Sequence, residues 1–480
     1  MLFNSLQFFI FFLIVTPVYY LLPHRWRWLH LLISSCLFYC AFIPVYIFIL
    51  FFTIAIDYVA GIMIENASGK KRKTFLTMSI VANVGVLAIF KYYNFFAENV
   101  TVLLGQLHIT TYAIPLLNII LPLGLSFHTF QAMSYTIEVY RGNQKAEKHF
   151  GIYALYVMFY PQLVAGPIER PQNMLHQFHE EHQFDYVNLL TGLRLMLWGL
   201  FKKVVVADRV ALYVNEIYAH PGNFHYGNII LALIFFAIQV YCDFSGYSDI
   251  ALGSAKTMGF DLMLNFNRPF VSKNITEFWR RWHISLSTWF NDYLFTPITI
   301  AQRDWGKYAI IFALITTFFI SGLWHGAGWT FIIYGLLHGL AMTYEFLSKK
   351  IRKKISKNIP ILIYNPISQL ITFCFLVLAW VFFRSPDFET AMLIIKKIAL
   401  LDSSPAFAFT LIGSSIYGKL YFSLTALVVI ALFSVEYFTS VSLKEFNRQL
   451  LPDILFCTTI LTAIVIFGVF KQTSFIYFQF

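Results

Sequence analysis

The chain has 480 residues, of which 58% are hydrophobic and 12% are charged, and its mean hydropathy is +0.66. A soluble domain of this length could not cover so much apolar surface, so the composition excludes a soluble protein and indicates a polytopic membrane protein. The net charge of +11 does not indicate nucleic-acid binding, because the cations cluster beside apolar segments and form no extended basic face.

Apolar stretches long enough to cross or deeply enter a bilayer recur along the chain and predict an all-α protein with roughly 11–12 transmembrane segments. The stretch 29–64 is long enough for two spans that meet near Pro44. No repeat or long linker divides the chain, so we expect one integral-membrane domain over residues 1–480. In chain order the stretches lie at about 6–22, 29–64, 75–93, 113–133, 189–206, 229–255, 309–323, 330–347, 361–383, 421–438 and 454–470.

Two basic runs, at 70–73 and 349–357, border these stretches. Lysine and arginine are enriched in the cytoplasmic loops of membrane proteins. If the N-terminus is extracytoplasmic and 29–64 makes two spans, both basic runs are cytoplasmic and the turn after His325 opens on the opposite side. We therefore predict a multi-pass protein in contact with membrane lipid, with its basic loops in the cytoplasm.

Two segments have polar or helix-breaking residues among apolar ones. Residues 161–170, with the sequence PQLVAGPIER, have the proline and glycine pattern of a re-entrant or interrupted helix. Residues 241–249 carry Asp243 and Ser245 inside the stretch 229–255, and Gly246 predicts a break there. Their polar groups could form a proton or ion path, or a buried network that positions another helix, and we favour the network.

The belt 256–307 is too polar to cross a bilayer and predicts amphipathic helices at the cytoplasmic interface. Asn274 or Thr276 is expected to cap a helix that runs on through EFWRRWHISLSTWF. Arg280 and His283 would lie on its more polar face, and Trp282 on its apolar one. Arg280 and Arg281 are candidates for binding phosphate groups, although tryptophan and arginine also serve as plain interfacial anchors.

His325 lies between two apolar stretches, in the segment 319–331 with the sequence FISGLWHGAGWTF. An ionisable residue at membrane depth is a functional candidate by default, and the alternative is a histidine satisfied within a helix interface. The flanking glycines and tryptophans favour an aromatic cavity or tunnel. The five cysteines lack metal-ligand or disulfide spacing, so we expect neither a metal site nor a permanently bound cofactor.

Several motifs together resemble the membrane-bound O-acyltransferase family, in its bacterial branch of alginate and peptidoglycan O-acetyltransferase membrane subunits. The resemblance covers nearly the whole chain and implies helices around a central funnel or tunnel. It also implies that His325 is the essential membrane-embedded histidine and His283 a second histidine on the cytoplasmic side. The motifs are PQLVAGPIERP, YCDFSGYSDIALG, NFNRPFVSKNITEFWRRWHISLSTW, ISGLWHGAGWTFIIYGLLHG, WVFFRSPDFETA and the terminal FIYFQF.

The residues support acyl transfer from a thioester, which needs a base for the acceptor hydroxyl and donors for the developing oxyanion. A neutral, desolvated imidazole suits the base. Trp324, backbone N–H groups near Gly326, or a polar group of residues 241–249 could supply the donors. Because no Gly-x-Ser-x-Gly elbow is present, either His325 accepts the acyl group itself or an outside hydroxyl attacks directly.

The resemblance implies an enzyme of the bacterial inner membrane that takes acetyl groups from cytoplasmic acetyl-CoA and delivers them outward. A separate extracytoplasmic acetyltransferase of the SGNH type would then modify a polysaccharide. D-alanyl transfer to teichoic acid is the alternative within the family, and a proton-coupled transporter or channel is the alternative of another class. After Leu294 the sequence FTPITIAQR departs from the Pro-Leu-Gly-Gly type of turn in alginate enzymes, which weakens alginate as the acceptor.

Overall fold

A computed structural model describes residues 1–109, 113–402, 416–438, 450–470 and 475–476. Regular structure in these residues is helical, apart from an isolated bridge between Phe266 and Trp282, which confirms the all-α polytopic membrane fold. Six helical segments of the described chain are long and apolar enough to cross a membrane: Pro44–Asn66, Gly69–Gln106, Tyr226–Lys256, Lys307–His325, Trp329–Leu347 and Ile361–Arg384. Shorter apolar helices lie at Leu6–Leu21, Ser423–Tyr437 and Ile454–Phe467.

The described residues form two compact units. The first comprises Met1–Leu193 and Ala251–Met263, and the second comprises Arg194–Ile250 and Leu264–Phe480. The helices α9 (Tyr186–Phe201) and α11 (Tyr226–Lys256) carry residues of both. That the whole chain acts as one integral domain stays a prediction.

In the first unit, a buried polar cluster joins three helices that pack on one another. Asp57 of α3 accepts hydrogen bonds from Ser79 (2.6 Å) and Asn83 (2.9 Å) of α4, and Ser79 also reaches Thr136 of α6. Such a network satisfies a carboxyl group that would otherwise be costly to bury. The helices of this unit are α1 (Leu6–Leu21), α2 (His24–Cys40), α3 (Ile47–Asn66), α4 (Gly69–Leu87), α5 (Tyr93–Gln106), α6 (Leu125–Arg141), α7 (Phe150–Met158) and α8 (Pro171–His179).

Two predictions about this unit have different outcomes. The division of 29–64 near Pro44 is confirmed, because α2 ends at Cys40 and α3 begins at Ile47. The span expected at 113–133 is wrong: residues 113–122 form no helix, and α6 begins only at Leu125. Pro115, Pro122 and a left-handed Gly124 (φ +74°) interrupt the stretch, whose apolar character alone had suggested a helix.

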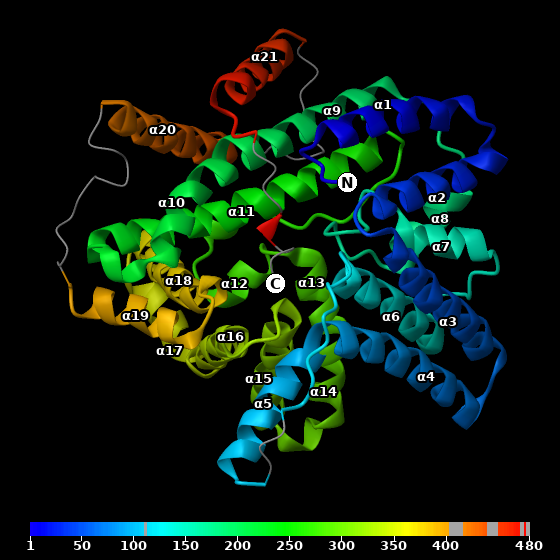
Figure 1. Ribbon diagram of the computed structural model, residues 1–480, viewed down its shortest axis with the longest axis horizontal. Helices are drawn as coiled ribbons and strands as arrows, with labels where there is room; N and C mark the ends of the chain where they lie inside the picture. Colours follow the sequence, from blue (N-terminus) through cyan, green and yellow to red (C-terminus); the bar gives the residue numbers. More distant parts are fainter. Residues whose placement is uncertain (110–112, 403–415, 439–449, 471–474, 477–480) are drawn as a thin grey trace. The chain divides into compact units, whose positions relative to one another are not determined.

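The second unit contains the antiparallel pair α15 (Lys307–His325) and α16 (Trp329–Leu347), which lie side by side in Figure 1. A Cβ atom added to Gly335 of α16 would lie 2.9 Å from the Cα of Gly322 in α15, so the two backbones meet directly there. The other helices are α10 (Asp208–Ala219), α12 (Ile275–Trp279), α13 (Ile284–Phe290), α14 (Thr296–Ala301), α17 (Lys349–Asn358), α18 (Ile361–Arg384), α19 (Phe388–Ala399), α20 (Ile416–Phe438) and α21 (Leu450–Phe467).

The break predicted at Gly246 is also wrong, because α11 is continuous through it. The glycine serves packing instead: a Cβ atom at Gly246 would lie 2.7 Å from the carbonyl oxygen of Gly199 in α9. Close approach of two helices through small residues is a common way of packing helices in membranes. A π-helical turn, Lys202–Ala207, follows α9 and carries Lys202 and Lys203 into the interior.

Candidate functional site

The turn between α15 and α16 begins at His325, the last residue of α15. Gly326 and Gly328 then adopt extended backbone before α16 starts at Trp329. The His325 side chain is 4% exposed and lies among aromatic rings: its centroid is 5.0 Å from Trp324, 5.7 Å from Tyr334 and 5.2 Å from Phe383. The imidazole is therefore held in a largely apolar wall from which bulk water is excluded.

His283 occupies a break between two short helices. The single helix predicted through EFWRRWHISLSTWF is wrong, since α12 ends at Trp279 and α13 begins at Ile284. His283 between them has a left-handed backbone (φ +43°), a conformation that costs energy for a residue with a side chain. Of the two predicted caps the structure shows Asn274, whose side chain accepts a hydrogen bond (2.8 Å) from the backbone N–H of Glu277 at the start of α12.

The left-handed turn directs His283 into the interior, where its side chain is fully buried. The Phe244 ring of α11 contacts the His283 imidazole edge-on, with 4.6 Å between the ring centroids, and the centroid of the Trp324 ring is 5.9 Å from that of His283. Burial lowers the pKa of His283 to about 3, so the imidazole is neutral at physiological pH. Hydrogen bonds from the Ile284 N–H to the Asn265 carbonyl (2.9 Å) and from Ser285 to the Asn265 side chain (2.6 Å) stabilise the turn.

The structure thus brings His283 and His325, which are far apart in the sequence, to the same tryptophan. The Trp324 ring is within ring-contact distance of both imidazoles. Two buried histidines on one aromatic residue form a candidate site in which each imidazole can donate or accept a hydrogen bond.

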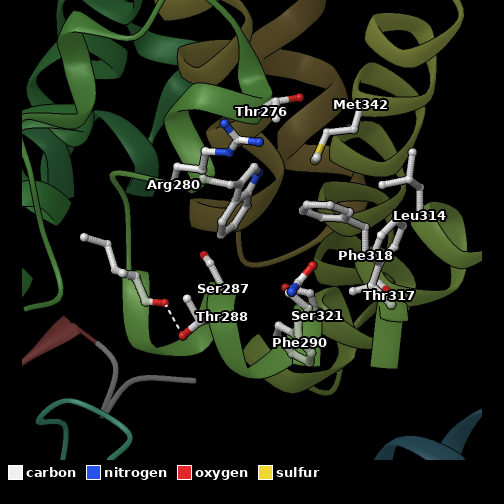
Figure 2. A pocket seen from close by; sticks show the side chains of 14 residues that line it. Thr276, Arg280, Ser287, Thr288, Phe290, Leu314, Thr317, Phe318, Ser321 and Met342 are labelled. Carbon is white, nitrogen blue, oxygen red and sulfur yellow. Dashed lines mark hydrogen bonds between the residues drawn. The ribbon is translucent and has the colours of Figure 1, made fainter. Parts of the chain in front are cut away.

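A cavity of about 540 Å³ lies beside this site, between α12, α13 and α15 (Figure 2). Its described lining includes Arg280, which is the single charged side chain there, and Ser321, which precedes His325 by one helical turn. His325 itself is not among the lining residues. The other lining residues are Thr276, Trp279, Ile284, Ser287, Thr288, Phe290, Asn291, Phe295, Leu314, Thr317, Phe318 and Met342.

Two residues of α16 that we did not predict from the sequence hold the α12 wall of this cavity. The Trp279 indole N–H donates a hydrogen bond (3.2 Å) to Nδ1 of His338, whose side chain is 1% exposed. The Glu345 carboxylate accepts hydrogen bonds from the backbone N–H groups of Ile275 (2.6 Å) and Thr276 (3.0 Å). His338 could have been found by the rule that singled out His325, because it too is an ionisable residue inside a membrane-length apolar helix.

The remaining predicted site residues lie elsewhere. The Arg281 guanidinium forms an ion pair with Glu277 (3.0 Å) and does not line the cavity. Asp243 forms an ion pair with Lys203 (2.6 Å) and accepts a hydrogen bond from the Ile476 N–H (2.7 Å). Ser245 is buried in α11 and is also absent from the cavity lining. The contacts of Asp243 match the buried polar network that we favoured over a proton path.

The sequence departure after Leu294 forms a helix. The π-helical turn Asn291–Phe295 leads into α14, and Asn291 and Phe295 line the cavity. The segment that differs from the alginate pattern therefore begins at the wall of the candidate site. Of the terminal FIYFQF motif only Phe475 and Ile476 lie in the described part of the chain, and the Phe475 ring stacks on Tyr247.

Residues 149–384 match the family model of the membrane-bound O-acyltransferases, a range that includes both site histidines. The probable alginate O-acetylase of Pseudomonas aeruginosa is 36% identical over 398 residues, covering 82% of this chain and 73% of that protein. The peptidoglycan O-acetyltransferase of Helicobacter pylori is 33% identical over 410 residues, covering 80% and 75%. The teichoic acid D-alanyltransferase of Bacillus subtilis is 31% identical over 241 residues, covering 48% and 61%.

Proposed function

The chain belongs to the membrane-bound O-acyltransferase family, and we propose that it moves acetyl groups from cytoplasmic acetyl-CoA to an extracytoplasmic polysaccharide. The observation that carries this proposal is the pair of buried histidines on Trp324 beside a cavity lined by Arg280. Two relatives described as O-acetylating enzymes match this chain over about four fifths of its length, which supports acetyl as the transferred group.

In the proposed reaction, His325 removes the proton from the attacking hydroxyl group, whose oxygen then bonds to the thioester carbonyl carbon. The carbon–sulfur bond breaks, and the leaving thiolate takes the proton from the imidazolium. A Trp324 N–H or a backbone N–H of the turn after His325 would hold the developing oxyanion. If His325 itself attacks, the same bonds break and an acyl-imidazole passes the acetyl group to the hydroxyl in a second step.

The cavity suits the narrow part of the donor better than its nucleotide. Its lining is mostly apolar, and Arg280 is available to a phosphate group where the donor passes from water into the protein. A pantetheine arm could enter such a space, whereas the charged nucleotide would stay outside because desolvating it is costly. Arg281 is less suited to this role, since its guanidinium already pairs with Glu277.

The location and partner complete the proposal. The basic runs at 70–73 and 349–357 support a cytoplasmic location of those loops in an inner-membrane protein, on the side of the acetyl-CoA pool. As the resemblance to the bacterial alginate and peptidoglycan O-acetyltransferase branch implies, we assign the final transfer to the polysaccharide to an extracytoplasmic SGNH-type acetyltransferase. D-alanyl transfer remains the second candidate, supported by the partial match to a teichoic acid enzyme.

Purified protein in proteoliposomes tests the donor. We expect the labelled acetyl group to pass from acetyl-CoA, added on the side of the membrane that bears the basic runs, to a polysaccharide acceptor on the other side. We expect no transfer from a D-alanyl carrier protein. Transfer from the D-alanyl donor alone would overturn the proposal in favour of the second candidate. In cells, ester-linked acetyl groups on surface polysaccharide should disappear without the protein and return with the wild-type chain.

A further inference from the structure

The helix α17 (Lys349–Asn358) joins two membrane-length helices, α16 and α18, through short connections. Its sequence, KKIRKKISKN, has six lysine and arginine residues and no acidic residue. The side chains of Ile351 and Ile355 on the same helix are 65% and 45% exposed. An ordinary solvated connection would account for the cations of this helix but not for its two exposed isoleucines.

The two kinds of side chain lie on opposite sides of α17. At about 100° per residue, Ile351 and Ile355 are about 40° apart around the helix axis, and the cations occupy the arc from about 100° to about 300° away from Ile351. This separation is the pattern of helices that lie in a membrane interface, with an apolar face toward the acyl chains and a basic face toward the headgroups.

The position of α17 between two membrane-length helices indicates that it lies at the bilayer surface. Because α16 and α18 are both long and apolar enough to span, the ten-residue helix between them has both ends at a bilayer surface. We propose that α17 is a binding site for anionic phospholipids, with Ile351 and Ile355 among the acyl chains and the lysines on the headgroup phosphates. This proposal concerns lipid binding and does not rest on the proposed acyl transfer.

A phosphate-bearing ligand could also be the acyl donor, because coenzyme A carries the same group. The isoleucines decide in favour of lipid: a soluble nucleotide offers no apolar partner for Ile351 and Ile355, whereas a phospholipid offers both parts. One of the cations of α17 also contacts a carboxylate of the neighbouring helix α16. Arg352 lies 3.7 Å from Glu345, whose carboxylate caps the start of α12 at the cavity wall. Lipid bound to α17 would therefore lie next to the support of the candidate site.

Native mass spectrometry of the full chain, released from bilayers of equal phosphatidylcholine and phosphatidylglycerol, tests the proposal. We expect the wild type to retain phosphatidylglycerol preferentially. Replacing Lys350, Lys353 and Lys354 with glutamine should lower this preference about threefold or more. The matched control replaces Lys70, Lys71 and Lys73 with glutamine, in a basic run that has no isoleucine stripe. These changes should lower the preference for phosphatidylglycerol much less.

A second variant separates the amphipathic helix from bare charge. The exchange Ile351→Lys with Lys353→Ile keeps composition and net charge but destroys the separation of faces, so it should lower the preference as well. Full retention in either α17 variant would overturn the proposal. Displacement of the bound phosphatidylglycerol by millimolar coenzyme A would also overturn it, since it would assign the basic face to the soluble donor. If the triple variant does not purify as a monodisperse protein, Lys354→Gln alone with the exchange variant gives the same comparison.

Discussion

The hydrogen bond between Trp279 and His338 offers the sharpest test of how the cavity wall is held. The changes are Trp279→Phe, His338→Phe and the two together. His338→Phe keeps a flat ring against Phe318, on which the imidazole stacks, but it leaves the Trp279 indole N–H buried without an acceptor. Trp279→Phe leaves Nδ1 of His338 without its donor. The double variant removes both polar groups at once.

The expected magnitudes follow from burial. Both side chains are more than 90% buried, and a buried donor or acceptor that loses its partner costs about 1–3 kcal/mol, whereas removal of both partners is nearly neutral. The two single variants should therefore each be destabilised, and the double variant should be less destabilised than their sum by about 2–6 kcal/mol, one orphaned-group cost from each single variant. Because Trp279 lines the cavity, we expect the single variants to raise KM for the donor by up to about tenfold, with a smaller effect on kcat.

The measurements are thermal unfolding of the purified protein and steady-state acetyl transfer with varied donor. The control is His338→Asn, whose side-chain oxygen can take the place of Nδ1 as acceptor and should preserve KM. Strict additivity of the two phenylalanine variants would refute the hydrogen bond as the link. An unchanged KM in both single variants, with lowered stability, would show that His338 supports the fold without shaping the cavity.

Four further predictions address the site, its packing and its orientation. His325→Ala should lower acyl transfer by about 10²-fold or more without loss of the purified protein, and His283→Ala should lower it by a smaller margin; near-normal transfer by His325→Ala would refute the mechanism. Arg280→Gln should raise KM for acetyl-CoA but not for acetyl-pantetheine, which lacks the nucleotide phosphates; an equal rise for both would assign Arg280 a different role. Gly335→Ala should destabilise the protein by about 1–3 kcal/mol, because its Cβ atom would lie 2.9 Å from the Gly322 Cα, whereas Gly85→Ala, with open space around it, should not. A cysteine at Ser356 in α17 should be labelled only from the cytoplasm, and labelling from outside would invert the predicted topology.

The membrane class and most helices could be predicted because they depend on local composition. Long apolar stretches and positive flanks need no tertiary information, so the division at Pro44 and the α15–α16 pair follow from the sequence. The errors at 113–133 and at Gly246 have one cause. Hydropathy shows that a segment is buried, but it does not show whether a proline or glycine breaks the helix or packs against a neighbour.

The sequence named candidate site residues but not their geometry, and the catalytic roles of these residues stay predictions. The rule about ionisable groups at membrane depth identified His325, and the family resemblance identified His283. Their meeting at Trp324 depends on the left-handed turn at His283, which no periodicity indicates, because helical spacing continues smoothly across it. The roles of Arg281, Asp243 and Ser245 could not be judged from sequence, since they depend on whether each side chain already has a partner in the fold.

The burial of His283 limits what it can do in the reaction. With a pKa lowered to about 3, it carries no charge at physiological pH, so it cannot attract a phosphate and can act only as a neutral donor or acceptor of a hydrogen bond. In the proposed reaction, attraction of the donor would then fall to Arg280, the single charged side chain in the described lining of the cavity. A neutral histidine that contacts Trp324, as His283 does, is better suited to orient the thioester or its leaving group in the proposed reaction. The two histidines should therefore differ in kinetics, with His325 affecting kcat most strongly and His283 affecting the choice of donor.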